Sequence, residues 1–277
     1  MRSRAHLLRS ELIGVAGVIE RNLYLTRRYI WWDVAFLVWT VANTLTIVFI
    51  GRGIEASGGA IDVERVTTYL LIGAVIWAYL GIIFEFITET VAWERWEGTI
   101  EYTFMAPLRR SAHLAGMAAF AVLYGLIRAL LIFGIVGLFF DLSLSNANFL
   151  AAIVVLLVAS VSFAGIGIMT AVLPLISPEK GAQLGFVAQG VLLVVSGIYY
   201  PVNVLPDWMR WLAAISPATY ALDGVRDALL DGADLTTMGP TLGILVLIGA
   251  VCIPAGLALF SAGERYAKRH GKLKRSG

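Results

Sequence analysis

Six long runs almost free of charged residues constrain this chain more than any other feature of its sequence. A helix rises about 1.5 Å per residue, so about 20 residues cross the hydrocarbon of a bilayer. Arg128 interrupts the third run, and the polar start of the fourth, LSLSNAN, shortens its helix to about residues 149–176. The runs are 34–51, 66–84, 111–140, 142–178, 181–206 and 235–263. The sequence therefore predicts an all-α integral membrane protein with six transmembrane helices.

The composition agrees with this class and gives no sign of a catalytic centre. The chain is 59% hydrophobic and 14% charged, whereas soluble domains carry about 25% charged residues. Its one cysteine excludes a disulfide framework within the chain, and its three histidines lie far apart with no HExxH spacing. We expect no catalytic residue, no bound metal or cofactor, and no nucleic-acid partner.

The distribution of Lys and Arg predicts the orientation in the membrane. If both termini are cytoplasmic, 16 of the 21 basic residues fall in cytoplasmic segments and four in external ones. Cytoplasmic segments of membrane proteins are enriched in Lys and Arg. We therefore expect both termini inside.

Residues 1–30 have the pattern of a basic amphipathic helix. Apolar residues recur at helical spacing, and most charged residues fall elsewhere on the helical wheel. The apolar positions are Leu8, Leu12, Val15, Ile19 and Leu23. Such a helix is typical of the membrane interface, although a helix packed on a soluble partner has the same pattern. We divide the single domain 1–277 into this helix, the membrane region 31–263 and a basic cytoplasmic tail, 264–277.

Two short external helices are predicted before the last span. Pro206 and Pro217 suit the first turns of helices over 206–215 and 217–230, with Ser216 as an N-cap. Both pieces are too short to cross a membrane, so we expect them to dip into the outer leaflet or to be re-entrant. Trp208, Trp211, Pro217 and Tyr220 are the residues that we assign to this pair.

Residues 93–110, WERWEGTIEYTFMAPLRR, form the first cytoplasmic loop in this topology. Six of these eighteen residues are charged. Gly98 is suited to end the preceding helix, Thr99 to cap a short new one, and Pro107 to end it. Ser111 can cap the third span, and Ile100, Phe104 and Met105 are expected to project as apolar contacts. A helix that docks on a soluble partner and an ordinary solvated connector are both compatible with this pattern.

Several polar residues fall within the predicted spans. An arginine at the centre of a membrane helix costs about 2.5–3.5 kcal/mol on insertion scales, so it needs a partner or a wet cavity. Glu85 and Glu89 share a helix face because they are four residues apart. The residues are Glu85, Glu89, Arg128, Gln183 and Gln189. We favour structural pairing over a polar lining for substrate.

Two motifs make the chain resemble the membrane permease of an ABC-type-2 exporter. The first runs from Glu94-Arg95-Trp96-Glu97 through Gly98-Thr99-Ile100-Glu101 to Pro107. The second joins Ser196-Gly197, Tyr200-Pro201, Leu205-Pro206, Trp208 and the stretch SPATYA at residues 216–221. The resemblance covers nearly the whole chain.

The resemblance implies that residues 98–107 form a coupling helix seated on a nucleotide-binding subunit. The residues expected to serve it are Glu94, Arg95, Glu97, Gly98, Thr99, Glu101, Phe104 and Pro107. It also implies a second permease copy, in a homodimer or pseudo-dimer within the lipid of a prokaryotic inner or plasma membrane. The resemblance does not fix the exported compound. Because nothing in the spans indicates a strongly charged path, we expect a hydrophobic or amphipathic compound such as a drug, lipid, glycolipid or polysaccharide. The sequence has no GxxxxGK[ST] loop, so we expect ATP and Mg²⁺ on the partner ATPase.

Three other classes compete with this interpretation. A channel or secondary carrier predicts internal repeats or rings of ionisable groups within the spans, and no repeat is found. A membrane-embedded enzyme needs convergent His, Asp or Cys side chains. The coupling component of an importer would also bind ATPase subunits, but the expected external helix pair favours an exporter.

Overall fold

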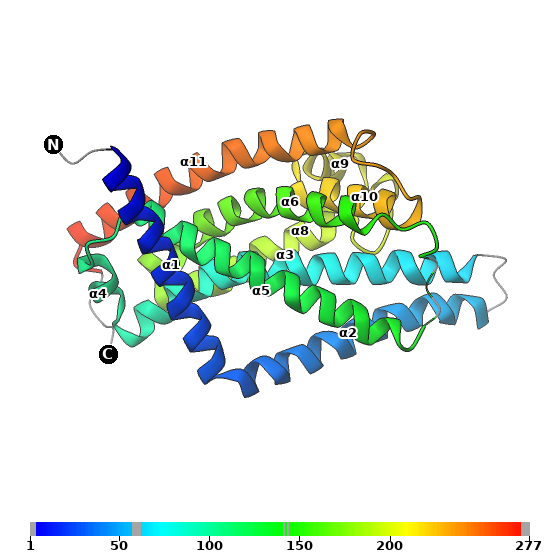
Figure 1. Cartoon of the computed structure of the whole chain (residues 1–277), viewed down its shortest axis with the longest axis horizontal. Coiled ribbons are helices and arrows are strands. Elements are labelled where there is room, and N and C mark those ends of the chain that lie inside the picture. Colours follow the sequence, from blue (N-terminus) through cyan, green and yellow to red (C-terminus); the bar gives the residue numbers. More distant parts are fainter. Residues whose placement is uncertain (1–3, 57–61, 141, 143, 273–277) are drawn as a thin grey trace.

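The chain is an elongated bundle of helices in the computed structural model, which describes residues 4–56, 62–140, 142 and 144–272. No strand occurs in these ranges. The long helices run along the long axis of the bundle (Figure 1). The short helix α4 lies at one end of that axis and α9 and α10 lie at the other. We refer to these as the α4 end and the α10 end.

The helices follow the predicted order. The first half of the chain forms α1 (Arg4–Arg28), α2 (Ile30–Ala56), α3 (Val63–Glu97), α4 (Ile100–Met105) and α5 (Arg110–Gly137). The second half forms α6 (Phe149–Thr170), α7 (Val172–Ile176), α8 (Pro178–Val195), the 3₁₀ turn η1 (Val202–Val204), α9 (Asp207–Ile215), α10 (Pro217–Leu230) and α11 (Gly239–Arg269).

Among the described residues, five helical segments are long and apolar enough to cross a membrane, so the chain is a multi-pass membrane protein. They are Ile30–Gly53, Val63–Glu97, Arg110–Gly137, Phe149–Ile176 and Gly239–Arg269. The fifth predicted run, 181–206, holds α8, which ends at Val195 because the chain reverses at Gly197, whose φ of 70° is left-handed. Its apolar part, Lys180–Val195, is shorter than the other five, so the count of six stays a prediction.

Several element boundaries differ from those predicted. Helix α3 extends beyond its charge-free run, which ends at residue 84, to the stop predicted at Gly98, and α11 continues past residue 263 to Arg269. Helix α5 begins at Arg110 with Arg109 as its N-cap, so Ser111 does not cap it. Charged residues end a hydrophobic run without ending a helix, because they are good helix formers beyond the hydrocarbon.

Helix α3 forms the centre of the bundle. Tyr79, Ile83 and Ile87 on it are fully buried, and the Tyr79 hydroxyl hydrogen-bonds the hydroxyl of Ser160 on α6 at 2.6 Å. Helices α2, α5, α6, α8 and α10 all pack on α3. Its central position gives its polar side chains partners on neighbouring helices, as for Tyr79 with Ser160 and Thr88 with Thr170.

Small residues bring α6 and α11 close together. A Cβ added at Gly165 of α6 would lie 2.6 Å from the Cβ of Cys252, and one at Gly256 of α11 would lie 2.8 Å from the carbonyl oxygen of Gly165. This contact is the close helix approach that small residues allow in membranes.

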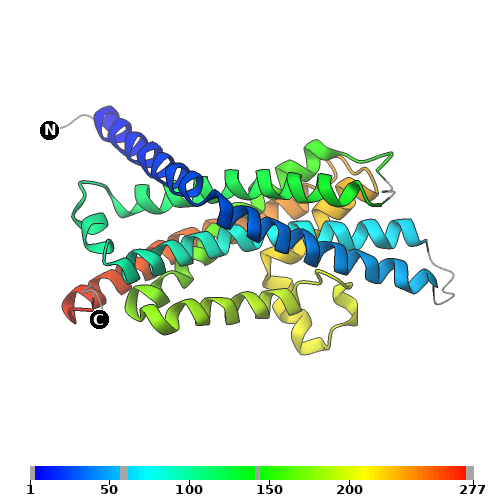
Figure 2. The same cartoon turned by 90° about the horizontal axis from the view of Figure 1, so that it is seen from below.

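Helix α1 crosses the bundle obliquely and meets α2 at a bend (Figures 1 and 2). It packs on α5, where Val18 is buried against Gly116, and Leu12 and Leu23 remain exposed. The exposed leucines leave one apolar face of α1 uncovered within the chain.

Candidate functional site

The α4 end begins with a sharp reversal at Gly98. Its φ is 77°, and its backbone N–H donates to the Arg95 carbonyl at 3.3 Å, so Gly98 ends α3 as the sequence predicted. Thr99 precedes α4, but its side chain makes no capping hydrogen bond. Its hydroxyl donates instead to the Glu94 carbonyl at 3.4 Å, back toward α3.

A three-residue charge cluster, Arg110, Glu264 and Lys268, holds α4 against α5 and α11. Glu264 is 8% exposed and accepts from Arg110 Nε through both carboxylate oxygens at 3.2 Å and from Lys268 Nζ at 2.6 Å. Arg110 also donates to the carbonyls of Thr103 at 3.1 Å and Phe104 at 2.6 Å. One guanidinium therefore binds both the end of α4 and the last turns of α11.

The inner face of α4 packs on this cluster. The Arg110 guanidinium lies 4.3 Å from the centroid of the Phe104 ring, and Lys268 Nζ lies 5.4 Å from it, within the range of cation–π attraction. Ile100 is 1% exposed. The expectation that Ile100 and Phe104 project outward is wrong, because α4 turns this apolar side toward the protein. Met105 does project outward.

Glu94 and Arg95 lie inside the protein instead of on the loop surface. Glu94 is 7% exposed and pairs with Arg21 of α1 at 2.6 Å, with His113 Nε2 3.9 Å away. Arg95 is 3% exposed. A second pair, Arg109 with Glu11 at 2.8 Å, also joins the loop to α1. Sequence reasoning missed these partners, because they lie on elements distant in the chain.

The outer face of the α4 end is therefore smaller than predicted. The candidate residues Glu97, Thr99, Glu101 and Pro107 are exposed, and Gly98 is half-buried. Tyr102 and Met105 are 72% and 71% exposed, although the sequence did not single out Tyr102. Trp96 is also exposed, with its ring 5.6 Å from that of Trp93. This acidic and aromatic face is available to a partner.

A cavity of about 590 Å³ lies between α2, α3, α5 and α8. Four predicted polar residues line it: Glu85, Glu89, Arg128 and Gln189. Gln183 does not line it and is exposed elsewhere on α8. The structure thus collects most of the polar residues of the spans around one space.

Arg128 finds its partners on α5 and α2. It donates to the Tyr124 hydroxyl at 3.2 Å, and Tyr124 in turn donates a short hydrogen bond to Asp33. In the part of the chain that the structure describes, no ion pair within 4 Å joins Arg128 to Glu85 or Glu89. Sequence reasoning missed Asp33, whose signal was a lone acidic residue at the start of the first run.

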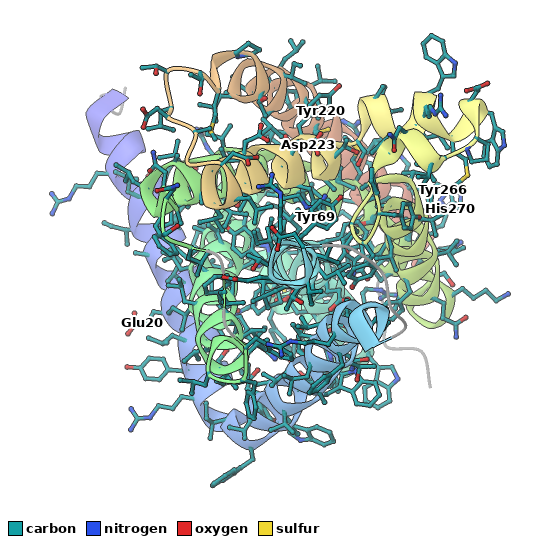
Figure 3. All side chains as sticks on the ribbon, turned by 90° about the vertical axis from the view of Figure 1, so that its right-hand side faces the viewer. Glu20, Tyr69, Tyr220, Asp223, Tyr266 and His270 are labelled. Atoms are coloured by element: carbon teal, nitrogen blue, oxygen red, sulfur yellow. The ribbon has the colours of Figure 1, made fainter. Side chains whose placement is uncertain are left out.

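At the α10 end, α10 is buried inside the bundle by α3, α6 and α11. Arg226, 6% exposed, donates to the carbonyls of Gly197 at 3.1 Å and Ile198 at 2.6 Å, and lies 3.6 Å from the centroid of the Tyr69 ring. Figure 3 shows Tyr69 and Asp223 where α3 and α10 face each other. A Cβ at Gly73 would lie 2.2 Å from the Ile198 carbonyl, so this junction requires glycine.

The predicted helix pair thus has two different environments. Trp208 and Trp211 on α9 are 67% and 78% exposed. Pro217 is buried in the first turn of α10, and the Tyr220 hydroxyl donates to the Ala214 carbonyl at 2.7 Å. Helix α9 is a surface helix and α10 is a core helix.

Comparison with known proteins agrees with this architecture. The family model described as "ABC-2 type transporter" matches residues 22–230, which is most of the chain. The chain belongs to the ABC-2 type transporter family. It is accordingly a transmembrane component of an ABC transporter, and this family's membrane components are generally non-catalytic.

Two curated relatives match the chain in part. The linearmycin resistance permease protein LnrN of Bacillus subtilis is 30% identical over 112 residues, covering 40% of this chain and 29% of that protein. The ABC transporter G family member 20 of Dictyostelium discoideum is 28% identical over 115 residues, covering 41% of this chain and 16% of that protein. The chain therefore aligns with less than a third of either relative.

Proposed function

We propose that the chain is the permease subunit of an ATP-driven exporter, powered by separate ATPase subunits that dock on α4. In this proposal α8 also crosses the membrane, as the fifth of six spans; both termini and α4 are cytoplasmic, and α9 and α10 are external. ATP and Mg²⁺ bind to the ATPase subunits, and a second copy of the permease completes a homodimer.

The arrangement of α4 supports this role. Its inner face is fixed to α5 and α11 through Arg110 and Glu264, while Glu101, Tyr102 and Met105 face outward. A helix held in this way moves together with the spans to which it is bound. Closure of two ATPase subunits would draw the α4 helices together and tilt those spans, which is a two-state mechanism.

The exported compound is hydrophobic or amphipathic in this proposal. The spans present mainly apolar surfaces, and the name of the Bacillus relative describes resistance to linearmycin. Drug-like, lipid and glycolipid compounds all belong to this class.

Co-purification tests the proposal. The tagged chain, extracted from its native membrane, should bring down an ATP-hydrolysing subunit in stoichiometric amount. Glu101→Lys and Tyr102→Ala should lower that yield at least several-fold, because they change the charge and shape of the docking face. Trp208→Ala on α9 is the matched control and should retain the partner. Full transport activity without any ATPase, or external labelling of a cysteine placed at Glu97, would contradict the proposal.

A further inference from the structure

The cavity between α2, α3, α5 and α8 combines a ligand-sized volume with a mixed lining. Its volume of about 590 Å³ lies within the range of about 300–1,000 Å³ typical of small-molecule sites. Residues of α2, α3, α5 and α8 line it, and α2 and α8 both pack on α3. The space is therefore large enough for a drug-sized compound.

The charges that line the cavity do not balance. Its lining includes three carboxylates, Asp33, Glu85 and Glu89, and one cationic side chain, Arg128. Arg128 is directed to Asp33 through the Tyr124 hydroxyl. Among the described residues neither Glu85 nor Glu89 forms an ion pair within 4 Å, so three carboxylates share the charge of one arginine.

The two glutamates are presented differently. Glu85 lies beside the Gln189 side chain in the lining. Gln189 reaches α3 because Gly81 has no side chain: a Cβ there would lie 2.9 Å from Gln189 Nε2. Glu89 is exposed to the space and makes no hydrogen bond or ion pair among the described residues. An unneutralised carboxylate within a membrane helix is unfavourable, and a bound cation would relieve it.

Aromatic rings supply the remaining recognition chemistry. Trp39 of α2, Trp77 of α3, Phe186 of α8 and Tyr199 after α8 all line the cavity. Rings attract cations through their faces and also bury apolar groups. Carboxylates and aromatic rings together favour a positively charged, largely apolar molecule over an anionic one.

We propose that this cavity binds an organic cation with an apolar body, held by Glu85 and Glu89 and by the surrounding aromatic rings. That this cation is also the exported compound rests on the proposed function. Its binding to the cavity can be measured without ATP or an ATPase subunit.

Two ions of the same shape and opposite charge test the charge preference. Tetraphenylphosphonium is the cationic probe and tetraphenylborate its anionic counterpart. Radiolabelled probe is added to the purified full-length chain in detergent, and saturable binding is measured as the part displaced by excess unlabelled probe. We expect saturable binding of the cation and at least tenfold weaker binding of the anion. Equal binding of both ions, or no saturable binding of the cation, overturns the proposal without any variant.

Substitutions assign the binding to the two glutamates. Glu85→Gln and Glu89→Gln should each weaken cation binding by about tenfold, and Glu89→Lys should reverse the preference toward tetraphenylborate. Glu20→Gln, on the exposed surface of α1 (Figure 3), is the matched control and should bind as the unmodified chain does. Normal cation binding by folded Glu85→Gln and Glu89→Gln chains would overturn the site. If these chains still co-purified with the ATPase, the proposed permease function would remain supported although the cation site was rejected.

Discussion

At the α4 end, charged side chains on four different helices hold the elements together, whereas at the α10 end one buried arginine binds backbone carbonyls. Arg110 and Glu264 join α5 to α11, and Arg21 and Glu94 join α1 to α3. At the α10 end, Arg226 fixes the residues that follow α8 beneath α10. Arg110 at the α4 end also binds the backbone carbonyls of Thr103 and Phe104, but it is shared with the carboxylate of Glu264. The comparison indicates an α4 end held mainly by ion pairs between side chains and an α10 end held by one buried arginine on backbone carbonyls.

The largest expected effect comes from removing Arg226. Arg226→Ala leaves the carbonyls of Gly197 and Ile198 without their donor in a buried place, which should lower the free energy of unfolding by about 3 kcal/mol. Denaturant unfolding in detergent micelles measures it. Arg65→Ala, which breaks an exposed pair with Asp231 at the same end, is the control and should leave the transition unchanged. Equal effects of the two substitutions would remove the distinction between the ends.

Removing Glu264 should affect the α4 end locally. Glu264→Ala leaves Arg110 and Lys268 without their carboxylate, so the free energy of local opening of α4 should fall by about 2 kcal/mol. Hydrogen exchange of residues 100–105 measures it. Lys268→Ala should have a smaller effect, since Arg110 still binds Glu264 and Lys268 is half exposed. Loss of protection throughout α10 as well would contradict the separation of the two ends.

The helix caps at the two ends should differ in strength. The Asn148 side chain accepts from the Ala151 N–H at 3.1 Å and begins α6 at the α10 end, so Asn148→Ala should cost about 1 kcal/mol. Thr99 makes no such bond, and Thr99→Ala should cost no more than a few tenths. Thermal unfolding of the two variants, compared with the unmodified chain, checks the order.

Salt should have the smallest effect, and it should act on one end. Raising the ionic strength from about 0.1 to about 1 M shortens the Debye length from about 10 to about 3 Å. The pair Arg109–Glu11, with 63% of the arginine side chain exposed, should weaken by a few tenths of a kcal/mol. Hydrogen exchange at the start of α5 should accelerate slightly, while exchange in α10 stays constant. Faster exchange in α10 would count against the comparison.

The sequence predicted the elements well because local patterns determine them. Charge-free runs located five membrane helices, Gly98 marked the end of α3, and Pro217 marked the start of α10. The length of α8 was overestimated because residues 196–206 are apolar but follow the reversal at Gly197. Composition alone does not distinguish an apolar segment that is not helical from the end of a transmembrane helix.

The partners within the site could not be predicted in the same way. Glu94 is paired with Arg21, and Glu264 with Arg110, across 73 and 154 residues of sequence. Helical spacing shows which residues share a face but not which helix that face meets. For this reason Phe104 was assigned to the outer surface, structural pairing was preferred to a polar lining for Glu85 and Glu89, and Asp33 was not recognised as part of that lining.

Helix α3 has 35 residues without a break, so it is about 50 Å long, against about 30 Å of hydrocarbon. Tyr69 near one terminus supports Arg226, Glu85 lies beside the cavity, and Gly98 at the other terminus leads into α4. One unbroken helix therefore connects these three places, and a helix with a hinge would not. A tilt of α3 that begins at its Gly98 end should change both the shape of the cavity and the contact between Tyr69 and Arg226.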